Sequence, residues 1–287
     1  MTPAAIPHAS SVGDASLLLN ERDFKRIAAV LFEDSGIHLP EGKSSLVYSR
    51  LARRLRVLGL ESFHDYCNLV CSEDGADERQ AMLSALTTNV TRFFRESHHF
   101  VDLAKQIRTR WINPIKAGGR LRIWSAGCSS GEEPYSIALT VLSQLPDAER
   151  YDVRILATDI DERILDKAKA GLYSADAVEP IPAEMRNRWV EKLPGGDFSV
   201  GAEARNLVSF RPLNLMADWP MKGRFNAIFC RNVAIYFDQP TQDRLWSRYA
   251  PLLTPDGRLY IGHSERVGSK QFQSDGLTSY RLAGEVE

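Results

Sequence analysis

Residues 17–86 carry their hydrophobic side chains at helical spacing. In two stretches, apolar residues recur three or four positions apart, which is the pattern of a helix with one buried face. Gly59 is suited to stop a helix, and Ser62 is suited to cap a third, short one. We therefore predict a small all-helical domain, with one helix over about residues 43–58. The apolar positions of the two longer helices are Phe24, Ile27, Ala28, Leu31, Phe32, Leu51, Leu55 and Leu58.

From residue 120 onward, short apolar runs alternate with helical patterns. Strands that alternate with helices are typical of a parallel, doubly wound sheet. Residues 172–213 interrupt this rhythm with a helix near 183–193 and a hairpin through 197–210. We predict an α/β domain over 120–287 in which about 172–213 form a small antiparallel insertion. The predicted strands of the main sheet are 121–124, 153–158, 225–230 and 258–261.

Two segments lie outside these domains. Residues 1–16 are rich in Ala, Ser and Pro, and we expect them to form a disordered tail. Residues 87–119 join the two domains through a polar segment and a helix, which Pro114 and the following glycines should end.

The centre of the chain, residues 121–140, predicts a strand, a loop of small residues and a helix. This unit lays a ligand against a helix N-terminus. Glu132 and Glu133 begin the predicted helix, where two carboxylates would repel a pyrophosphate, and the loop is not G-x-G-x-x-G. An amine and a sulfonium would suit these carboxylates, and S-adenosylmethionine carries both. Asp159 ends the second strand and is placed to bind ribose hydroxyls, the alternative being a helix cap.

The same loop also matches G-x-S-x-G, the nucleophile elbow of serine hydrolases. The chain order permits a triad of Ser129, Asp238 and His263. We disfavour this interpretation because such an elbow normally follows several strands, and nothing before Leu121 resembles a strand. The plainest alternative is a tight turn that needs small residues for close packing.

The composition of the 287 residues is that of an ordinary globular protein, with a formal net charge of −1. This charge argues against a general nucleic-acid-binding protein. No apolar run is long enough to span a bilayer, and the N-terminus lacks the basic and apolar regions of a signal peptide. We therefore expect a cytoplasmic protein with neither nucleic-acid partners nor membrane insertion.

Neither the cysteines nor the paired histidines predict a metal site. Cys67 and Cys71 lie one helical turn apart, but no histidine pair is placed to complete a zinc site, so we expect free buried thiols. His98 and His99 are adjacent. Because adjacent residues on a helix point apart, we expect them on the surface of the linker helix.

Five segments, taken in order, resemble the bacterial chemotaxis receptor methyltransferases, the CheR family. They are LTTNVTRFFRESHHF (86–100), IWSAGCSSGEEPYSIA (123–138), ATDID (157–161), FNAIFCRNVAIYFD (225–238) and LTPDGRLYIGHSE (253–265). The resemblance covers roughly residues 20–282. It implies an all-helical N-terminal domain, a Rossmann-like S-adenosylmethionine-dependent methyltransferase domain and a small antiparallel β subdomain. It also implies methyl transfer to glutamate side chains on the signalling helices of methyl-accepting chemotaxis receptors, giving glutamate methyl esters and S-adenosylhomocysteine.

The resemblance implies roles for individual residues as well. Catalysis falls on Arg95 and Tyr236. The loop after Gly195 is short compared with those of members that tether to a receptor's C-terminal peptide, which does not favour peptide tethering through the β subdomain. The cofactor-binding positions are Asn89, Thr91, Arg95, Glu133, Asp159, Asn214, Leu215, Arg231 and Asn232.

Each implied role has a plainer alternative. Arg95 could form an ordinary interdomain ion pair, and Tyr236 could be a core aromatic residue. Three rival functions also stay open: a serine hydrolase acting through Ser129, a small-molecule methyltransferase, and a non-catalytic receptor-binding adaptor on the same fold.

The predicted helix over 43–58 is strongly basic. Four arginines occur in seven residues with no acid among them: Arg50, Arg53, Arg54 and Arg56. We expect the leucine stripe to hold this helix to its neighbours, so that Arg53 and Arg56 share an outer face and bind an anionic receptor helix. A merely solvated charged face is the alternative.

Overall fold

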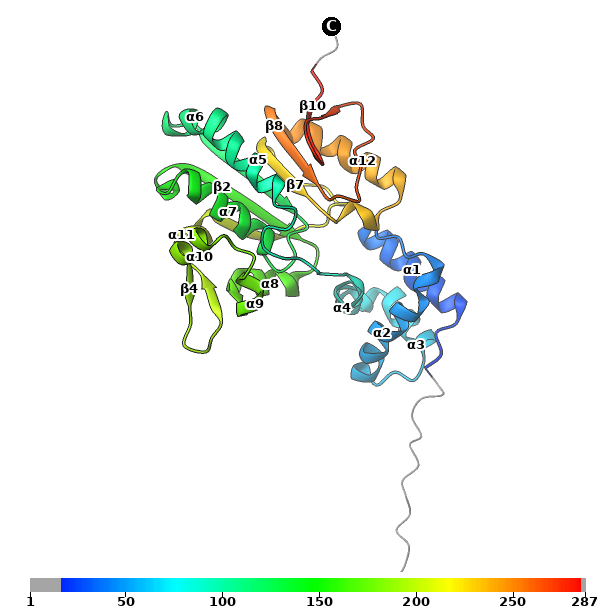
Figure 1. The fold of residues 1–287 in the computed structure, drawn as a ribbon. Helices are drawn as coiled ribbons and strands as arrows, with labels where there is room; N and C mark the ends of the chain where they lie inside the picture. The colour runs from blue at the N-terminus through cyan, green and yellow to red at the C-terminus, as the bar shows by residue number, and fades with distance from the viewer. Residues whose placement is uncertain (1–16, 285–287) are drawn as a thin grey trace, which may run out of the picture. The chain divides into compact units, whose positions relative to one another are not determined.

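A computed structural model describes residues 17–284 of the chain (Figure 1). Their contacts divide them into two compact units. The helical unit comprises residues 17–33 and 39–86, and the α/β unit comprises residues 34–38 and 87–284. The expected tail, residues 1–16, lies outside the described residues.

The helical unit is built from helices throughout its described part, as the apolar spacing predicts. The second helix ends at Gly59, whose φ of 68° is the left-handed conformation that glycine tolerates. Ser62 caps the third helix through its side chain. Leu51 and Leu55 are buried, but Phe32 and Leu58 are each 38% exposed, so the prediction that these two lie in the buried stripes is wrong. The elements are α1 (Glu21–Ser35), η1 (Glu41–Lys43), α2 (Ser44–Leu58), α3 (Phe63–Cys71), η2 (Glu73–Gly75) and α4 (Ala76–Leu86).

The α/β unit is organised on a seven-stranded sheet in the order β6-β2-β1-β7-β8-β10-β9. Its strands are β1 (Arg120–Ala126), β2 (Asp152–Asp159), β6 (Val208–Pro212), β7 (Phe225–Cys230), β8 (Leu253–Ile261), β9 (Phe272–Ser274) and β10 (Ser279–Leu282). The first five are parallel, and β10 runs antiparallel to both of its neighbours. Because β1 lies between β2 and β7, the chain winds outward in both directions. Ligands bind such sheets at the carboxyl edge, beside the strand where the winding reverses.

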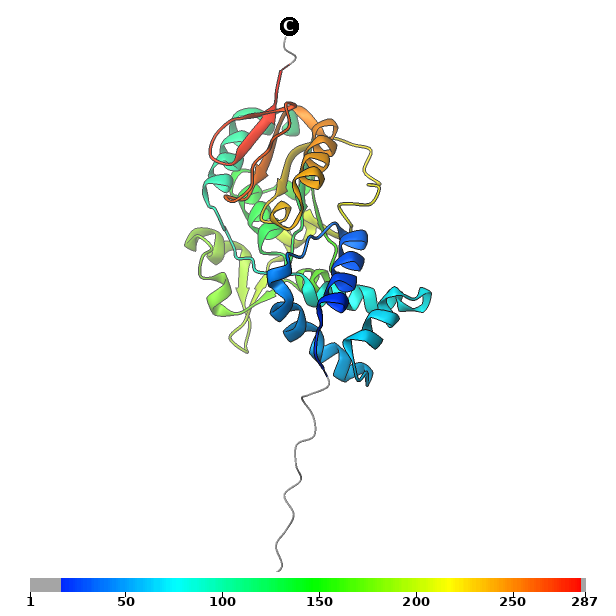
Figure 2. The same cartoon turned by 90° about the vertical axis from the view of Figure 1, so that its right-hand side faces the viewer.

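Helices cover both faces of this sheet (Figure 2). They are α5 (His98–Gln106), the π-helical turn η3 (Ile107–Trp111), α6 (Ile112–Lys116), α7 (Glu132–Gln144), α8 (Glu162–Ala170) and α12 (Gln239–Tyr249). Leu121 and Ile123 of β1 join a hydrophobic cluster that includes α5 and α7. The neighbouring Trp124 and Ala126 join a second cluster that includes α12. Alternating side chains of one strand thus supply two cores, which explains why the strand reads as a continuous apolar run.

A small antiparallel sheet, in the order β3-β5-β4, lies between β2 and β6 in the sequence, as predicted. The hairpin predicted through 197–210 is wrong. The actual hairpin joins β4 to β5 and turns at Gly195 and Gly196, whereas residues 208–212 form the edge strand β6 of the main sheet. Val208 and Phe210 alternate with polar residues, a pattern that fits either pairing, and only the distant partner β2 decides it. The elements here are β3 (Leu172–Tyr173), α9 (Ala175–Val178), α10 (Ala183–Trp189), β4 (Val190–Lys192), β5 (Phe198–Val200) and α11 (Ala202–Leu207).

The strand β8 starts earlier than predicted. Leu253 already pairs with Phe225, and residues 254–257 then bulge before Arg258 pairs with Ala227. All four cysteines are free thiols; three are buried as expected, but Cys71 is exposed. Within residues 17–284, no helix combines the length and the apolar composition needed to cross a membrane.

Candidate active site

The predicted site residues of the α/β unit follow four neighbouring parallel strands. Glu133 lies beyond the loop after β1, Asp159 ends β2, Asn214 follows β6, and Arg231 follows β7. Since parallel strands present their carboxyl ends at one edge of the sheet, these positions share that edge. The fold therefore supplies a single ligand-binding edge for residues that lie far apart in the sequence.

The loop after β1 is a tight turn held against β2. The backbone N–H groups of Gly127 and Cys128 donate to the Thr158 carbonyl, at 2.8 and 2.9 Å. Gly127 has a φ of 80°, and an added Cβ would lie 2.4 Å from a methyl group of Val233. The loop therefore requires small residues for close packing, as the alternative interpretation predicts. This requirement is compatible with ligand binding at the same edge of the sheet.

Asp159 connects this loop to the start of α8 through its two carboxylate oxygens. One oxygen accepts the Ser129 N–H at 2.8 Å, and the other accepts the Asp161 N–H at 3.0 Å. Burial raises the pKa of Asp159, although these hydrogen bonds oppose the shift. Asp161, rather than Asp159, caps α8 with its side chain. The Ile160 N–H also acts on this carboxylate, which with about four acceptor sites keeps capacity for a ligand hydroxyl.

Arg231 and Glu133 form a buried ion pair at the centre of the edge. The Glu133 carboxylate accepts the Ser125 hydroxyl at 2.7 Å and one Arg231 nitrogen at 3.0 Å. Burial raises the pKa of Glu133, while the Arg231 charge opposes that rise. A second Arg231 nitrogen donates to the Arg95 carbonyl and lies 3.3 Å from Glu96. The two terminal nitrogens of Arg231 are thus engaged by the protein's own groups, whereas its buried Nε has no hydrogen-bond partner among the described residues.

The segment before α5 is drawn onto the same edge. The Asn89 side-chain amide donates to the Asp161 carboxylate at 3.1 Å, and the Asn89 backbone carbonyl accepts the Ser129 hydroxyl at 3.1 Å. The Arg95 guanidinium donates back to the Val90 carbonyl at 3.1 Å. The structure therefore brings Asn89, Arg95, Glu133, Asp159 and Arg231 together, and Thr91 is half-buried within the same segment.

The remaining predicted residues stand outside this set of contacts. The Tyr236 carbonyl accepts the His38 N–H at 2.8 Å, and the Asn214 amide donates to the Asp34 carbonyl at 2.5 Å. Leu215 is buried in the cluster on the α12 face of the sheet. Tyr236 ends the 3₁₀ turn η5 (Ala234–Tyr236), with its side chain half-buried.

Two glutamates of this edge were missed from the sequence. Glu265 is 2% exposed and accepts four backbone N–H groups, which come from Gly262, Asn232, Val233 and Ala234. Glu96 accepts both the backbone N–H and the ring nitrogen of His263, at 3.3 and 2.9 Å. The only signal for either residue is its position inside a segment of family resemblance.

The serine-hydrolase triad is not assembled. The Ser129 hydroxyl donates to the Asn89 carbonyl, and Asp238 caps α12 by accepting the Thr241 N–H. The His263 ring contacts Glu96 instead of Asp238. Each member of the predicted triad is therefore committed to a different partner.

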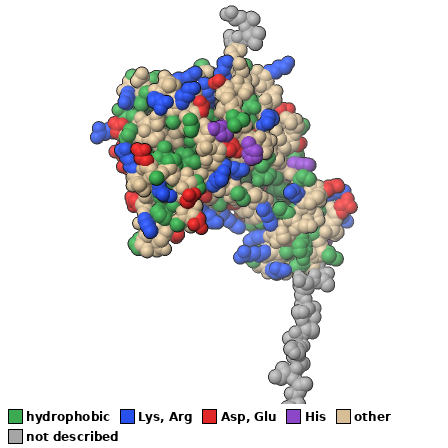
Figure 3. Space-filling view, in the orientation of Figure 1, with side chains coloured by type: hydrophobic (Ala, Val, Ile, Leu, Met, Phe, Trp, Pro, Cys, Tyr) green, Lys and Arg blue, Asp and Glu red, His purple; other side chains and the backbone are tan. Residues whose placement is uncertain are grey.

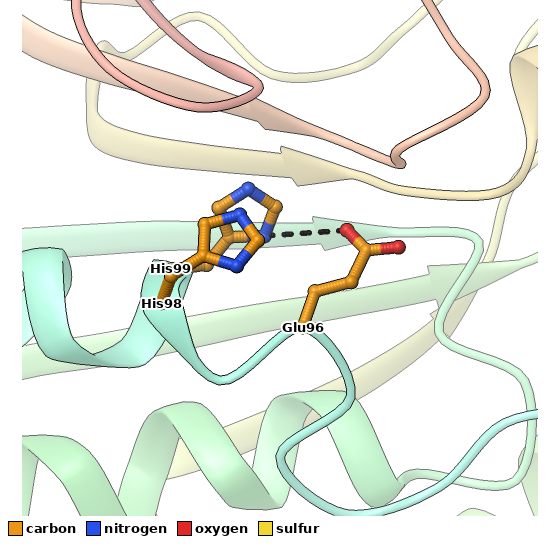
Figure 4. Close-up of side chains that lie close together, drawn as sticks. All are labelled: Glu96, His98 and His99. Atoms are coloured by element: carbon orange, nitrogen blue, oxygen red, sulfur yellow. Dashed lines mark ion pairs between the residues drawn. The ribbon is translucent and has the colours of Figure 1, made fainter.

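His98 and His99 lie together, contrary to the prediction that they diverge on a helix surface (Figure 4). Their ring centroids are 4.1 Å apart, His99 is fully buried, and both rings contact the Thr278 hydroxyl. One Glu96 oxygen lies 3.7 Å from the ring of His99. Burial, followed by the charge of Arg231, lowers the pKa of His99 to about 3, so this contact joins a carboxylate to a neutral ring.

Glu96, His98 and His99 are close enough together to suggest a metal site, and the local charges argue against one. The Glu96 oxygen that faces His99 also lies 3.3 Å from the Arg231 guanidinium. A metal ion there would meet a fixed positive charge at short range. We therefore assign the cluster to packing and hydrogen bonding.

In the helical unit, the four arginines of α2 have different environments. Arg50 donates to the Ala85 and Leu86 carbonyls, and Arg54 pairs with Glu78. Arg53 and Arg56 are exposed. Figure 3 shows Lys and Arg side chains gathered over the part of the helical unit where Figure 1 labels α2.

Two family models match this chain. One describes a CheR methyltransferase, SAM binding domain, over residues 89–281, and the other a CheR methyltransferase, all-alpha domain, over residues 22–87. The chain belongs to the CheR methyltransferase family. Its cofactor is therefore S-adenosylmethionine, and its fold is the methyltransferase fold with an all-helical N-terminal domain that the sequence predicts.

Relatives of the CheR family match nearly the whole chain. A "Probable chemotaxis protein methyltransferase" of Rhizobium etli is 52% identical over 258 residues, which cover 88% of this chain and 96% of the relative. A "Chemotaxis protein methyltransferase" of Escherichia coli is 43% identical over 274 residues, which cover 93% of each chain. A "Chemotaxis protein methyltransferase 2" of Pseudomonas aeruginosa is 44% identical and covers 94% of this chain and 96% of the relative.

Proposed function

We propose that this protein transfers the methyl group of S-adenosylmethionine to glutamate side chains of chemotaxis receptors in the cytoplasm, giving glutamate methyl esters. The observation that carries the proposal is the match to chemotaxis methyltransferases over nearly the full length of both chains. The acceptor residue type comes from the family resemblance, and the chemistry of the site is compatible with it.

A glutamate acceptor needs no general base. Its carboxylate is ionised near neutral pH, so an oxygen lone pair is available to attack the methyl carbon as the bond to sulfur breaks. The charges of carboxylate and sulfonium neutralise each other during this displacement. Catalysis then depends on alignment at near-contact distance and on the removal of water from the carboxylate. The site accordingly requires neither a nucleophilic serine nor a metal ion.

The residues of the sheet edge divide the work of holding the cofactor. When bound, S-adenosylmethionine supplies an electrophilic methyl group. We assign its ribose to Asp159, whose carboxylate has acceptor capacity left. We assign its amino group to the surroundings of Glu133, where Arg231 holds the carboxylate in a fixed direction. Asn89, Thr91, Asn214, Leu215 and Asn232 complete the proposed set.

We assign the acceptor side of the reaction to Arg95 and Tyr236. The Tyr236 hydroxyl would hold the glutamate carboxylate, and Arg95 would order a carboxylate of the cofactor or of the acceptor. Tyr236→Phe should therefore lower kcat by about tenfold, while cofactor affinity stays unchanged, because a hydrogen bond to a charged group is lost. An unaltered kcat at saturating cofactor and receptor would remove this role.

We propose that the helical unit recognises the receptor. An acceptor helix bearing several glutamates is strongly anionic, and the exposed Arg53 and Arg56 offer opposite charge. We infer recognition without peptide tethering through the small sheet, whose β4–β5 turn is short.

The direct test supplies methyl-labelled S-adenosylmethionine and a receptor cytoplasmic fragment. Label should enter the receptor and leave as methanol under mild base, as expected of a carboxyl ester. A receptor-binding adaptor would bind the fragment without transferring label. A small-molecule methyltransferase would leave the receptor unlabelled, and label resistant to base would mean that another atom accepts the methyl group.

A further inference from the structure

The short turn that follows β8, residues 262–265, bridges two segments that are distant in the sequence. On one side, the Glu265 carboxylate accepts the backbone N–H groups of residues 232–234, at 3.0, 2.9 and 2.7 Å. These residues lead directly into Tyr236. Glu265 also accepts the N–H of Gly262, which closes the turn on itself.

On its other side, the 262–265 turn holds the segment that contains Arg95. His263 contacts one oxygen of Glu96 through its backbone N–H and its ring. The other Glu96 oxygen faces Arg231, and Arg231 donates to the carbonyl of Arg95. Burial alone would raise the pKa of Glu96, but the bond to His263 and the charge of Arg231 hold it down at about 2. Glu96 therefore stays a carboxylate, which accepts hydrogen bonds from His263 on one side and pairs with the Arg231 charge on the other.

The backbone around Arg95, in the segment that the 262–265 turn contacts through Glu96, is strained. Phe94 and Glu96, which flank Arg95, have φ values of 52° and 55°. Asn232 has 59°, an angle that asparagine adopts readily. Residues other than glycine and asparagine keep such angles only where their surroundings hold them, and such residues cluster at functional sites. On the N-terminal side of Arg95, the Phe94 N–H donates to the Ser136 hydroxyl at 3.0 Å.

Close contact also restricts the turn itself. An added Cβ on Gly262 would lie 2.5 Å from the Asn232 amide nitrogen and 2.9 Å from Glu265. The turn and the segment after β7 thus touch at a position that admits only glycine. These contacts leave little freedom for either segment to shift alone.

We propose that the 262–265 turn is a positioning element, which fixes the Arg95 segment and the Tyr236 segment relative to each other for methyl transfer. Glu96 and Glu265 are its two anchors and act through Arg95 and Tyr236. The proposal rests on the proposed function, in that Arg95 and Tyr236 serve the reaction. It assigns a task to two glutamates and a histidine that the reaction chemistry does not itself require.

The test compares Glu96→Gln and His263→Gln with the matched control Glu149→Gln in the full-length protein. Glu149 is an exposed glutamate that precedes β2, away from the carboxyl edge. Glu96→Gln should lower kcat for receptor methylation by about tenfold to a hundredfold, the cost of misplacing a reacting group by about 1 Å. His263→Gln should have a smaller effect in the same direction. Affinity for S-adenosylhomocysteine should fall much less than kcat, because the ribose and amino contacts assigned to Asp159 and Glu133 remain.

A double variant with Arg95→Ala tests whether Glu96 positions Arg95 or has a purely structural role. If Glu96 acts through Arg95, Glu96→Gln should cost little further activity in an Arg95→Ala background. Multiplicative losses in the double variant, together with a lowered unfolding midpoint, would overturn the proposal. Glu265→Gln is the companion variant for Tyr236. If Glu265→Gln fails to fold, the decision rests on Glu96 and on the exposed His263.

Arg95→Ala by itself keeps this proposal distinct from the proposed function. If Arg95→Ala retains full turnover, the assigned role of Arg95 is wrong and the positioning proposal falls with it. If Arg95→Ala loses turnover and Glu96→Gln does not, the proposed function stands and the positioning proposal fails alone.

Discussion

Arginines with predicted binding roles occur in both units of this protein, in opposite environments. The Arg231 side chain in the α/β unit is 2% exposed and lies between Glu133 and Glu96. Arg53 in the helical unit is exposed to solvent. A buried guanidinium fixes the geometry around it because its partners cannot relax into water. An exposed guanidinium acts through an electrostatic field that salt screens. It therefore contributes more to partner recognition than to the stability of the fold.

The largest expected effect follows from removing the buried charge. Arg231→Met would leave Glu133 buried without its cation, which should cost about 3–5 kcal/mol of unfolding free energy. Arg53→Met is the matched exposed change and should shift stability by less than about 0.5 kcal/mol. Urea unfolding of both variants measures the contrast. Equal losses of unfolding free energy in the two variants would show that the buried Arg231 stabilises the fold no more than the exposed Arg53.

The pH dependence of the free energy of unfolding tests whether the buried His99 ring is neutral in the folded protein. His99 has a pKa lowered to about 3, so between pH 6.5 and 4.5 the unfolded chain binds a proton that the folded chain excludes. Stability should therefore fall on acidification, with His99 contributing up to about 1.4 kcal/mol per pH unit. His99→Gln should flatten this slope, and the exposed control His38→Gln should not. If His99→Gln keeps the wild-type slope, His99 is not held neutral by its burial.

The cofactor contact is expected to have an intermediate effect. Asp159→Ala removes the proposed ribose acceptor and should weaken S-adenosylhomocysteine binding by about 1.5–3 kcal/mol. Because Asp159 also holds the loop after β1, Asp159→Asn is the necessary companion, since it keeps one acceptor oxygen. Calorimetry gives both affinities. Unchanged affinity in a folded Asp159→Ala variant would place the ribose elsewhere.

The smallest effect belongs to the exposed arginines. Arg53→Ala with Arg56→Ala should raise the KM for receptor by a few fold, consistent with about 0.2–1 kcal/mol for each exposed charge pair, and should leave cofactor affinity unchanged. Raising salt from low to physiological strength should impair the wild type more than the double variant. Equal salt sensitivity would mean that these arginines are only a solvated face.

Local signals were enough to predict most of the fold. Gly59 and Ser62 mark helix ends through their own backbone conformations and hydrogen bonds. The runs that became β1 and β7 are largely buried on both faces, and β2 is so towards its carboxyl end. The strand β6 was missed because its partner β2 lies some fifty residues earlier in the chain. Alternation alone cannot identify such a partner.

The candidate site was less predictable for the same reason. The family resemblance predicts Arg231 and Glu133 as site residues, but their mutual ion pair depends on strands that meet only in the folded sheet. His99 is buried against Thr278, which precedes β10 and lies nearly 180 residues later in the chain, and the helical pattern around His99 does not indicate that contact. Glu265 acts entirely on backbone N–H groups, which leave no pattern in the sequence.

The most direct test of the central claim is to identify the atom that receives the methyl group. A receptor cytoplasmic fragment would be incubated with this protein and S-adenosylmethionine, digested, and mapped by peptide mass spectrometry. The account predicts the added mass of one methylene on glutamate side chains, reduced about tenfold in a Tyr236→Phe reaction stopped early and removed by mild base. Methylation of lysine or of backbone nitrogen, or consumption of S-adenosylmethionine without any modified receptor peptide, would contradict it.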